Sequence, residues 1–370
     1  MKKVLATILA LVMAIGLCSV SWADEAKVAK IGDTEYATLK EAIEHVANGE
    51  TIVLTADVNN GDGIVVTSGK NFTLDFAGHT YTITQNVVGS TGTENQCFQL
   101  LKDSTITMKD GAIVANCTGA LMIIQNYCNL TLDNMKLDAT AGTNNVGYVV
   151  SNNCGNVVIK NGTTITAKTT GVAFDVYGGF RDYGDVSVTL EAGATVNGKV
   201  EVARDTGTQN KNTLTVTGGT VNGELVVTEN EKTEVSVTGG TFSSDVSAYA
   251  PEGTPVAMVG NDYAVGSSAI SAAANGGKTV IVVKAGPING VDAGKSITVN
   301  RGVTGVTVNG VPVTGGSYTV PARYYYYNST TTTTDTKGSP KTFDAGIALY
   351  VGMALTSAAG VAFVGKKRED

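Results

Sequence analysis

The sequence predicts an all-β solenoid, in which short strands stack in successive coils. The first observation is a phrase of alternating apolar residues, a Thr and a Gly turn, clearest at 214–221 (LTVTGGTV) and 235–242 (VSVTGGTF). From the second copy onward the copies start 24, 27, 29, 28 and 21 residues apart. Repeats of this length, made of short strands broken by Gly and Asn, are typical of solenoids. The seven copies start at Phe72, Ile106, Leu130, Val157, Val186, Leu214 and Val235.

The composition favours the same class. The chain has 370 residues, of which 42% are hydrophobic, and this content excludes general disorder. The 45 glycines, with abundant Thr and Asn, favour tight turns and strands over helices. The net charge is −7, and no stripe of Lys or Arg follows the strands. We therefore expect no nucleic-acid partner.

Residues 1–23 are predicted to be a signal peptide. Two lysines precede an apolar run from Val4 to Leu17, and residues 21–23 form a small-x-small cleavage site. The apolar run is shorter than the roughly 20 residues of a membrane-spanning helix. We therefore expect an exported protein whose mature chain begins near Asp24.

The solenoid is expected over residues 24–250, beginning with a helix that covers its first coil. Thr38 and Glu41 have the spacing of a capping box, in which each side chain bonds the other's backbone amide. Apolar residues then recur at helical spacing until Asn48-Gly49. Because a solenoid cannot leave its first hydrophobic layer exposed, we predict an amphipathic capping helix from Leu39 to Ala47.

Each coil is expected to hold three strands. The repeated phrase is the first, and the third follows the Gly, as at Ile83, Ile113, Ile165 and Val196. Inward side chains of successive coils should stack about 4.8 Å apart. The second strands are predicted at 97–101, 120–124, 146–150, 172–176, 200–202 and 225–227.

From about Ile31 to Val246, including the helix-then-strand entry at Ala47–Leu54, the chain resembles the pectate-lyase-like proteins. The resemblance concerns architecture, and it implies a right-handed parallel β-helix. That family includes polysaccharide lyases, glycoside hydrolases and non-catalytic adhesins. A lyase of this kind needs a carboxylate cluster for Ca²⁺ and a basic residue, and a hydrolase needs paired acids.

After the solenoid, residues 251–321 are expected to form a small β module, because short apolar runs alternate with turns such as Asn309-Gly310 and Gly315-Gly316. Residues 322–338 are rich in Tyr and Thr and are expected to be a low-complexity spacer.

Residues 339–370 are predicted to contain a second targeting signal, in addition to the signal peptide. Pro340 and Thr342 match the Leu-Pro-any-Thr-Gly sorting signal of Gram-positive surface proteins, whereas Ser339 and Phe343 replace its Leu and Gly. An uncharged apolar stretch from Ala345 to Val364 follows, which is long enough for a transmembrane helix, and then a basic cluster. The resemblance implies a protein on the extracellular face of the cell envelope. Membrane tethering through the helix and sortase attachment to the cell wall, with peptidoglycan as partner, both remain open.

No catalytic residue, metal or cofactor is predicted, and Ca²⁺ enters only with the lyase alternative. The two histidines, His45 and His79, are too few for most metal sites or nucleophilic systems, and no Cys-x-x-Cys pair exists. Outward positions of the first strands carry mainly hydroxyls and alternating charges, which is typical of a solvated sheet.

Four cysteines follow the signal peptide: Cys97, Cys117, Cys128 and Cys154. Cys128 and Cys154 are one coil apart, and both precede a repeated strand within Asn-rich turns. A disulfide between these two and a stack of free thiols are both open.

One coil departs from the pattern and is the candidate binding site. Its stretch 174–185 (FDVYGGFRDYGD) and the following coil concentrate aromatic and charged residues. If Phe174 points inward, Asp175 points outward and should lie about 4.8 Å from Glu201 of the next coil. Aromatic faces beside acids and an arginine suit sugar recognition, and the alternative is a turn that only shields the solenoid. The candidate residues are Asp175, Tyr177, Phe180, Arg181, Asp182, Tyr183, Glu201 and Arg204.

Together these features predict a cell-surface, non-catalytic adhesin or glycan-binding element. Its expected partner is a host or environmental glycan or a surface protein, in addition to the cell membrane. A polysaccharide lyase or glycoside hydrolase on the same scaffold, and a purely structural stalk, are the alternatives.

Overall fold

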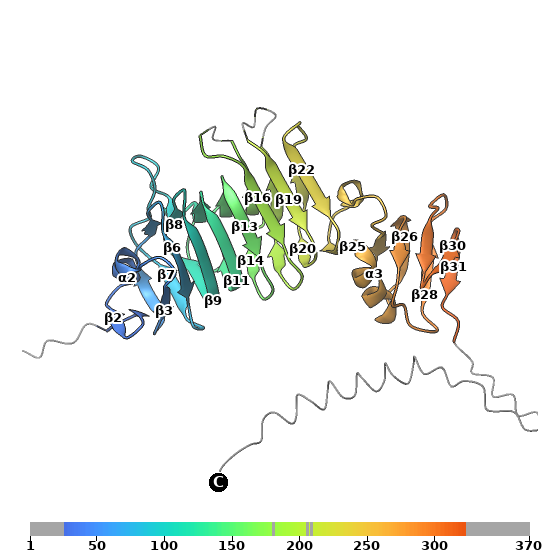
Figure 1. Cartoon of the computed structure of the whole chain (residues 1–370), viewed down its shortest axis with the longest axis horizontal. Coiled ribbons are helices and arrows are strands. Elements are labelled where there is room, and N and C mark those ends of the chain that lie inside the picture. Colours follow the sequence, from blue (N-terminus) through green and yellow to red (C-terminus); the bar gives the residue numbers. More distant parts are fainter. Residues whose placement is uncertain (1–25, 180–181, 205–206, 208–209, 323–370) are drawn as a thin grey trace, which may run out of the picture. The chain divides into compact units, whose positions relative to one another are not determined.

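The computed structural model describes residues 26–179, 182–204, 207 and 210–322, and its elements are nearly all strands (Figure 1). The predicted signal peptide, the spacer beyond Ala322, the sorting motif and the apolar stretch Ala345–Val364 lie outside these residues. Within the described part of the chain, no helix is long and apolar enough to cross a bilayer.

Strands at the first position of each coil pair in parallel with their counterparts in the coils before and after. The third-position strands continue the same sheet, with β9 and β11 serving both positions. The first-position strands are β3 (Thr51–Leu54), β6 (Asn71–Asp75), β9 (Thr105–Ala115), β11 (Asn129–Asp138), β13 (Gly155–Ile159), β16 (Val186–Leu190), β19 (Asn212–Val216) and β22 (Thr233–Val237). The other third-position strands are β4 (Val58–Gly61), β7 (Thr80–Ile83), β14 (Thr164–Thr166), β17 (Thr195–Asn197), β20 (Thr220–Asn222) and β23 (Gly240–Phe242).

A second sheet of seven strands holds the second position of each coil, and all its strands pair in parallel. Six of its strands fall within two residues of the predicted second positions, and the first strand of the sheet was not predicted. The fold is therefore all-β with parallel sheets, as a β-helix requires. The strands are β5 (Ile64–Val66), β8 (Gln96–Leu100), β10 (Met122–Asn126), β12 (Tyr148–Asn152), β15 (Val172–Val176), β18 (Lys199–Val202) and β21 (Leu225–Val227).

The pairing corrects one start of the repeated phrase. Val157 pairs with Val188, and Val188 pairs with Leu214, so the copy predicted to start at Val186 is in register two residues later. Because side chains alternate with a period of two, the slip leaves the same residues facing inward. The phrase therefore predicted the buried face correctly and the register incorrectly at this one coil.

The core consists of columns of aliphatic side chains, one from each coil. Members of the column that begins at Phe72 and ends at Leu214 are at most 3% exposed. Each side chain meets its counterpart in the neighbouring coils, which removes the whole column from water and makes burial the main stabilising term. Polar residues enter the buried layer at one corner, where Asn126 Nδ2 donates to Asn152 Oδ1 at 3.2 Å.

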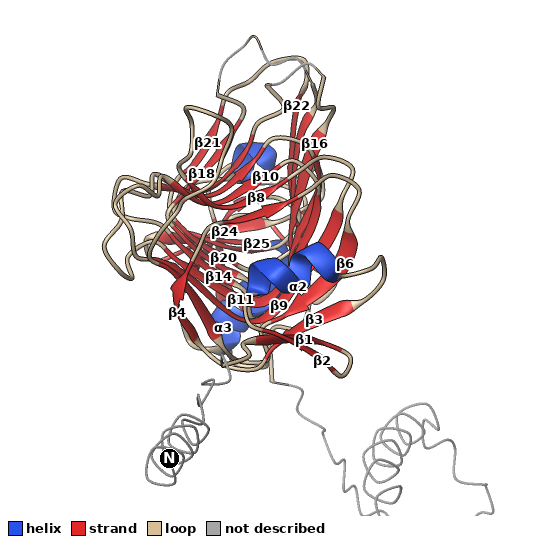
Figure 2. Ribbon diagram, turned by 90° about the vertical axis from the view of Figure 1, so that its left-hand side faces the viewer, coloured by secondary structure: helices blue, strands red, loops and turns tan. Residues whose placement is uncertain are grey.

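A helix lies across the N-terminal end of the coils, as Figure 2 shows. It is α2 (Leu39–His45), preceded by a hairpin of β1 (Ala29–Ile31) and β2 (Thr34–Tyr36), and it ends two residues earlier than predicted. The Glu41 amide donates to Thr38 Oγ1 at 3.1 Å, as the capping box requires. The Glu41 carboxylate accepts from the Ala37 amide rather than from that of Thr38. Leu39, Ala42 and Ile43 are buried in the same core as the coils.

Beyond the coils the chain forms a second small core, which includes a helix that the sequence interpretation missed. Helix α3 (Gly266–Asn275) buries Ile270 and Ala274 in this core. The sequence contained a signal for this helix, since Ala274-Asn275-Gly276 repeats the residues that follow the first helix. The other elements are η1 (Ser247–Tyr249), β24 (Val256–Val259), β25 (Asp262–Val265), β26 (Val280–Lys284), β27 (Pro287–Ile288), β28 (Ser296–Val299), β29 (Val306–Val308), β30 (Val311–Val313) and β31 (Gly316–Thr319).

Candidate functional site

The second sheet carries a polar column on its outer face, opposite the buried face that holds Phe174 and Val200. In this column Asp175 of β15 pairs in register with Glu201 of β18, as the alternation predicted. Earlier coils contribute amides and a hydroxyl, since Gln99 pairs with Gln125 and Gln125 with Ser151. The column is shielded from water, because these three side chains belong to residues at most 7% exposed.

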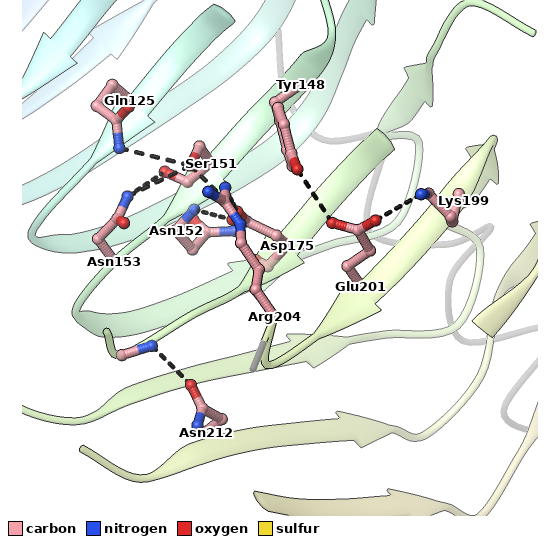
Figure 3. Close-up of polar contacts among 11 residues, drawn as sticks. Gln125, Tyr148, Ser151, Asn152, Asn153, Asp175, Lys199, Glu201, Arg204 and Asn212 are labelled. Atoms are coloured by element: carbon pink, nitrogen blue, oxygen red, sulfur yellow. Dashed lines mark hydrogen bonds and ion pairs between the residues drawn. The ribbon is translucent and has the colours of Figure 1, made fainter. Parts of the chain in front are cut away.

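Asp175 is fully buried, although it points away from the core. Its Oδ1 accepts from the Asn152 amide at 2.6 Å, and its Oδ2 accepts from Ser151 Oγ at 3.2 Å. Arg204 Nη2 lies 2.5 Å from the same Oδ2 (Figure 3). Burial raises the pKa of Asp175 to about 6, while Arg204 and the hydrogen bonds oppose that rise. Asp175 therefore holds Arg204 in place and has no carboxylate oxygen left to offer a ligand.

Arg204 occupies the centre of the site. Its guanidinium carbon lies 4.5 Å from the ring centroid of Tyr148 and 4.9 Å from that of Tyr177. Planar guanidinium groups stack on aromatic faces in this range. The side chain is still 35% exposed, so the guanidinium is oriented by the protein and also reaches the surface. Ala203 makes this direction possible, because its φ of 55° turns the chain sharply at the end of β18.

Glu201 is held beside this stack. Tyr148 Oη donates to Glu201 Oε2 at 3.2 Å, and Lys199 Nζ lies 2.5 Å from Glu201 Oε1. Only 16% of the Glu201 side chain is exposed. Both of its oxygens are therefore paired, and Glu201 serves to fix Tyr148 beside Arg204.

A second aromatic group lies where the loop after β15 folds back over earlier coils. Tyr183 lies 4.9 Å from Tyr127 between ring centroids, and Lys102 Nζ lies 6.0 Å from the Tyr183 ring. Lys102 Nζ also donates to the Asp182 carbonyl oxygen at 2.9 Å. The loop thus contacts the ends of β8 and β10, and 38% of Tyr183 stays exposed.

The start of this loop is fixed by the coil that follows it. The Gly178 amide donates to Asn212 Oδ1 at 2.6 Å, and Asn212 is fully buried (Figure 3). A Cβ at Gly179 would lie 2.2 Å from the Tyr177 ring, so only glycine permits the ring to pack there. Two loop residues of the predicted site, Phe180 and Arg181, lie outside the described residues.

Most of the candidate residues that the structure describes therefore lie close together, but they occupy different layers of the site. Tyr177 and Arg204 form the exposed stack, Asp175 and Glu201 lie beneath it, and Tyr183 belongs to the second aromatic group. Sequence reasoning missed Tyr148 and Tyr127, which lie one and two coils earlier. The signal was that Tyr148 begins a second-position strand and Tyr127 follows one, on the coils that precede the candidate stretch.

The acidic residues of this site do not fit Ca²⁺, which a lyase on this scaffold would need. Calcium takes six to eight oxygen ligands, largely carboxylates. Here the carboxylates of Asp175 and Glu201 already accept from an amide, two hydroxyls and two cations. Over the described residues, no group of three or more His, Cys, Asp and Glu side chains is placed to hold a metal ion. We derive no metal-dependent step.

Of the two alternatives left open for Cys128 and Cys154, the structure has the free thiols. Each sulfur makes a hydrogen bond to an oxygen instead. Cys128 Sγ donates to Asn126 Oδ1 at 3.3 Å, and Cys154 Sγ donates to the Tyr127 carbonyl oxygen at 2.8 Å. The turns that hold the two residues lie in neighbouring coils, and each thiol there has an oxygen acceptor of its own.

Comparisons with protein-family models, with curated proteins and with solved structures return no match to this chain.

Proposed function

We propose that this protein is a non-catalytic, glycan-binding adhesin of the cell surface, built on a right-handed parallel β-helix. The observation that carries the proposal is the Arg204 guanidinium, stacked on Tyr148 and Tyr177, oriented by a buried carboxylate and still partly exposed. A fixed arginine donates to sugar hydroxyls and carboxylates with little loss of side-chain entropy.

The neighbouring rings supply the apolar part of such a site. Sugar C–H groups pack on aromatic faces, and Tyr and Trp provide large contact areas with a polar edge. Four tyrosines from three successive turns lie on this face, with Tyr183 the most exposed. Glycan binding of this kind needs no catalytic group, which agrees with the pairing of both carboxylates.

A glycan array with the labelled protein tests the proposal. We expect binding to a restricted set of glycans, weakened about tenfold, or about 1.4 kcal/mol, by Tyr183→Ala. Tyr183→Phe retains the ring and should retain most of the affinity. Arg204→Ala should weaken binding similarly, whereas Arg301→Ala is the matched control, because Arg301 is an exposed arginine in the turn after β28.

Two other results would replace the proposal. Absence of binding to every glycan would favour a structural stalk. Release of unsaturated or hydrolysed products from polysaccharide, with or without Ca²⁺, would favour an enzyme on the same scaffold.

We further propose that the C-terminal 32 residues anchor the protein to the envelope. The support is the order of Pro340, Thr342, an apolar stretch and a basic cluster in the sequence. Cell fractionation distinguishes the two modes. Release by wall-degrading enzymes indicates attachment to peptidoglycan, and release only by detergent indicates a transmembrane tether.

A further inference from the structure

A polar groove lies where three successive coils pass from their third-position strand to the second sheet. Its volume is about 520 Å³, which falls within the roughly 300–1,000 Å³ of most ligand pockets. The turns that line it stack closely because of their glycines: a Cβ at Gly198 would lie 2.6 Å from that of Ala167, and a Cβ at Gly223 would overlap the Gly198 carbonyl oxygen. Backbone atoms therefore line part of the groove.

Amide and hydroxyl side chains also line the groove. Asn222 Nδ2 donates to Asn197 Oδ1 at 2.8 Å, and Asn197 Nδ2 donates to Thr166 Oγ1 at 3.2 Å. These bonds join residues that pair in register, and Asn222, Thr169 and Thr170 are exposed. An amide has two N–H groups and a carbonyl oxygen, so one such bond leaves further donors and acceptors for a ligand.

The charged side chains of the groove have both signs. Its two amines already have acceptors, since Lys199 Nζ lies 2.5 Å from Glu201 Oε1 and Lys168 Nζ donates to the Asn144 carbonyl oxygen. Glu224, which lines the same groove, is exposed. This mixture gives an anionic ligand no net attraction. It suits neutral sugar units, whose hydroxyls both donate and accept hydrogen bonds.

Lys199 connects this groove to the Arg204 stack. It begins β18, and its amine contacts Glu201, whose other oxygen accepts from Tyr148, the ring on which Arg204 stacks (Figure 3). Since β18 has four residues, each adding about 3.3 Å, its ends lie roughly 10 Å apart. A ligand that contacts both the groove and the stack is therefore longer than one sugar ring.

We propose that the groove and the Arg204 stack form one extended site for a neutral oligosaccharide of several sugar units. The inference rests on the proposed glycan-binding function and adds to it the charge and the length of the ligand. One end of the oligosaccharide packs on the Tyr177 ring and bonds Arg204, and the following units bond the amides and hydroxyls around Asn197 and Asn222.

Titration calorimetry of the full-length protein tests this inference with xylo-, manno-, cello- and chito-oligosaccharides of one to six units, and with oligogalacturonates as the acidic comparison. We expect at least one neutral series to bind, with an affinity that rises about tenfold or more between one and four units and then levels off. Asn222→Ala should weaken binding of the longest member about tenfold and leave the shortest unchanged. Asn156→Ala is the matched control, because Asn156 is an exposed asparagine of a first-position strand outside the groove.

The length dependence needs no variant, and circular dichroism confirms that each variant is folded. Affinity that does not rise with chain length, or equal effects of Asn222→Ala and Asn156→Ala, would overturn the extended site. If Arg204→Ala still abolished binding in that case, the proposed function would stand without the groove. Tighter binding of oligogalacturonates than of every neutral series, or no binding of any neutral series, would refute the neutral ligand. Absence of binding on the whole glycan array would refute the proposed function as well.

Discussion

The outer faces of the two sheets have the same ladder geometry but opposite exposure to water. On the first sheet the outward column pairs Asp75 with Lys109 and Lys109 with Asp133, and these side chains are 20–41% exposed. On the second sheet the equivalent column includes the fully buried Asp175 and Glu201, whose side chain is 16% exposed. The turns beside the second sheet are longer and fold over it, whereas the Gly turns of the first sheet do not. A charge in a ladder therefore acquires a structural role only where a turn covers it.

The largest expected effect on stability comes from removing the carboxylate of Asp175, the buried residue on the second sheet. Asp175→Ala leaves the Asn152 amide, Ser151 Oγ and Arg204 without their acceptor. We expect the free energy of unfolding to fall by about 3 kcal/mol or more, as when one partner of a buried ion pair is lost. Urea denaturation followed by circular dichroism measures it.

Asp133→Ala is the matched control on the first sheet, since Asp133 pairs with Lys160 at 3.5 Å on the surface. Its cost should stay below about 1 kcal/mol, because exposed ion pairs contribute little. Equal costs for the two variants would refute the contrast between the two faces.

The pH dependence isolates the carboxylate of Asp175. Its pKa rises from 3.8 to about 6 on folding, so between these values the folded protein binds more protons than the unfolded chain. Stability from this group is full below about pH 4 and is lost as the pH rises through about 6, on the order of 2–3 kcal/mol by pH 7.

Asp175→Asn keeps the shape of the side chain and removes this titration. The difference in unfolding free energy between wild type and Asp175→Asn should therefore change with pH over this window. A constant difference from pH 4 to pH 7 would mean that the carboxylate ionises at its ordinary pKa.

The smallest expected effect on stability concerns the exposed ion pairs of the first sheet and their response to salt. Lys160→Ala should change the free energy of unfolding by about 0.5 kcal/mol at low salt. At 1 M salt, where the Debye length is about 3 Å, this difference should vanish. The effect of Asp175→Ala should persist, because the Asp175 side chain itself is fully buried. Loss of both effects in salt would place Asp175 in a solvated environment.

Local pattern was enough to predict the strands and their buried faces. The alternation of apolar and polar residues around Leu214 indicates which side chains are buried. This alternation depends only on residues that are close in sequence. The capping helix followed from Thr38 and Glu41 for the same reason. The two-residue slip at Val188 was not predictable, because the length of the preceding loop, rather than the phrase, sets the register.

The candidate site was predicted only in part. Asp175 and Glu201 were expected side by side because both lie at the same position of successive coils. However, the two acids lie beneath the site and orient other side chains, whereas Arg204 and the neighbouring tyrosines form its surface. Tyr148 was missed because its partner, Arg204, lies 56 residues away in the sequence.

By itself, then, the sequence determined the repeat, the inward faces and the coil that departs from the pattern, since each depends on short-range alternation and spacing. Tertiary structure alone decided which outward residues are covered. The path of the long turns over the second sheet excludes water from Asp175 and turns Arg204 onto the rings of Tyr148 and Tyr177. Solvent exclusion depends on segments that are distant in sequence, and it sets the pKa of the buried Asp175 carboxyl.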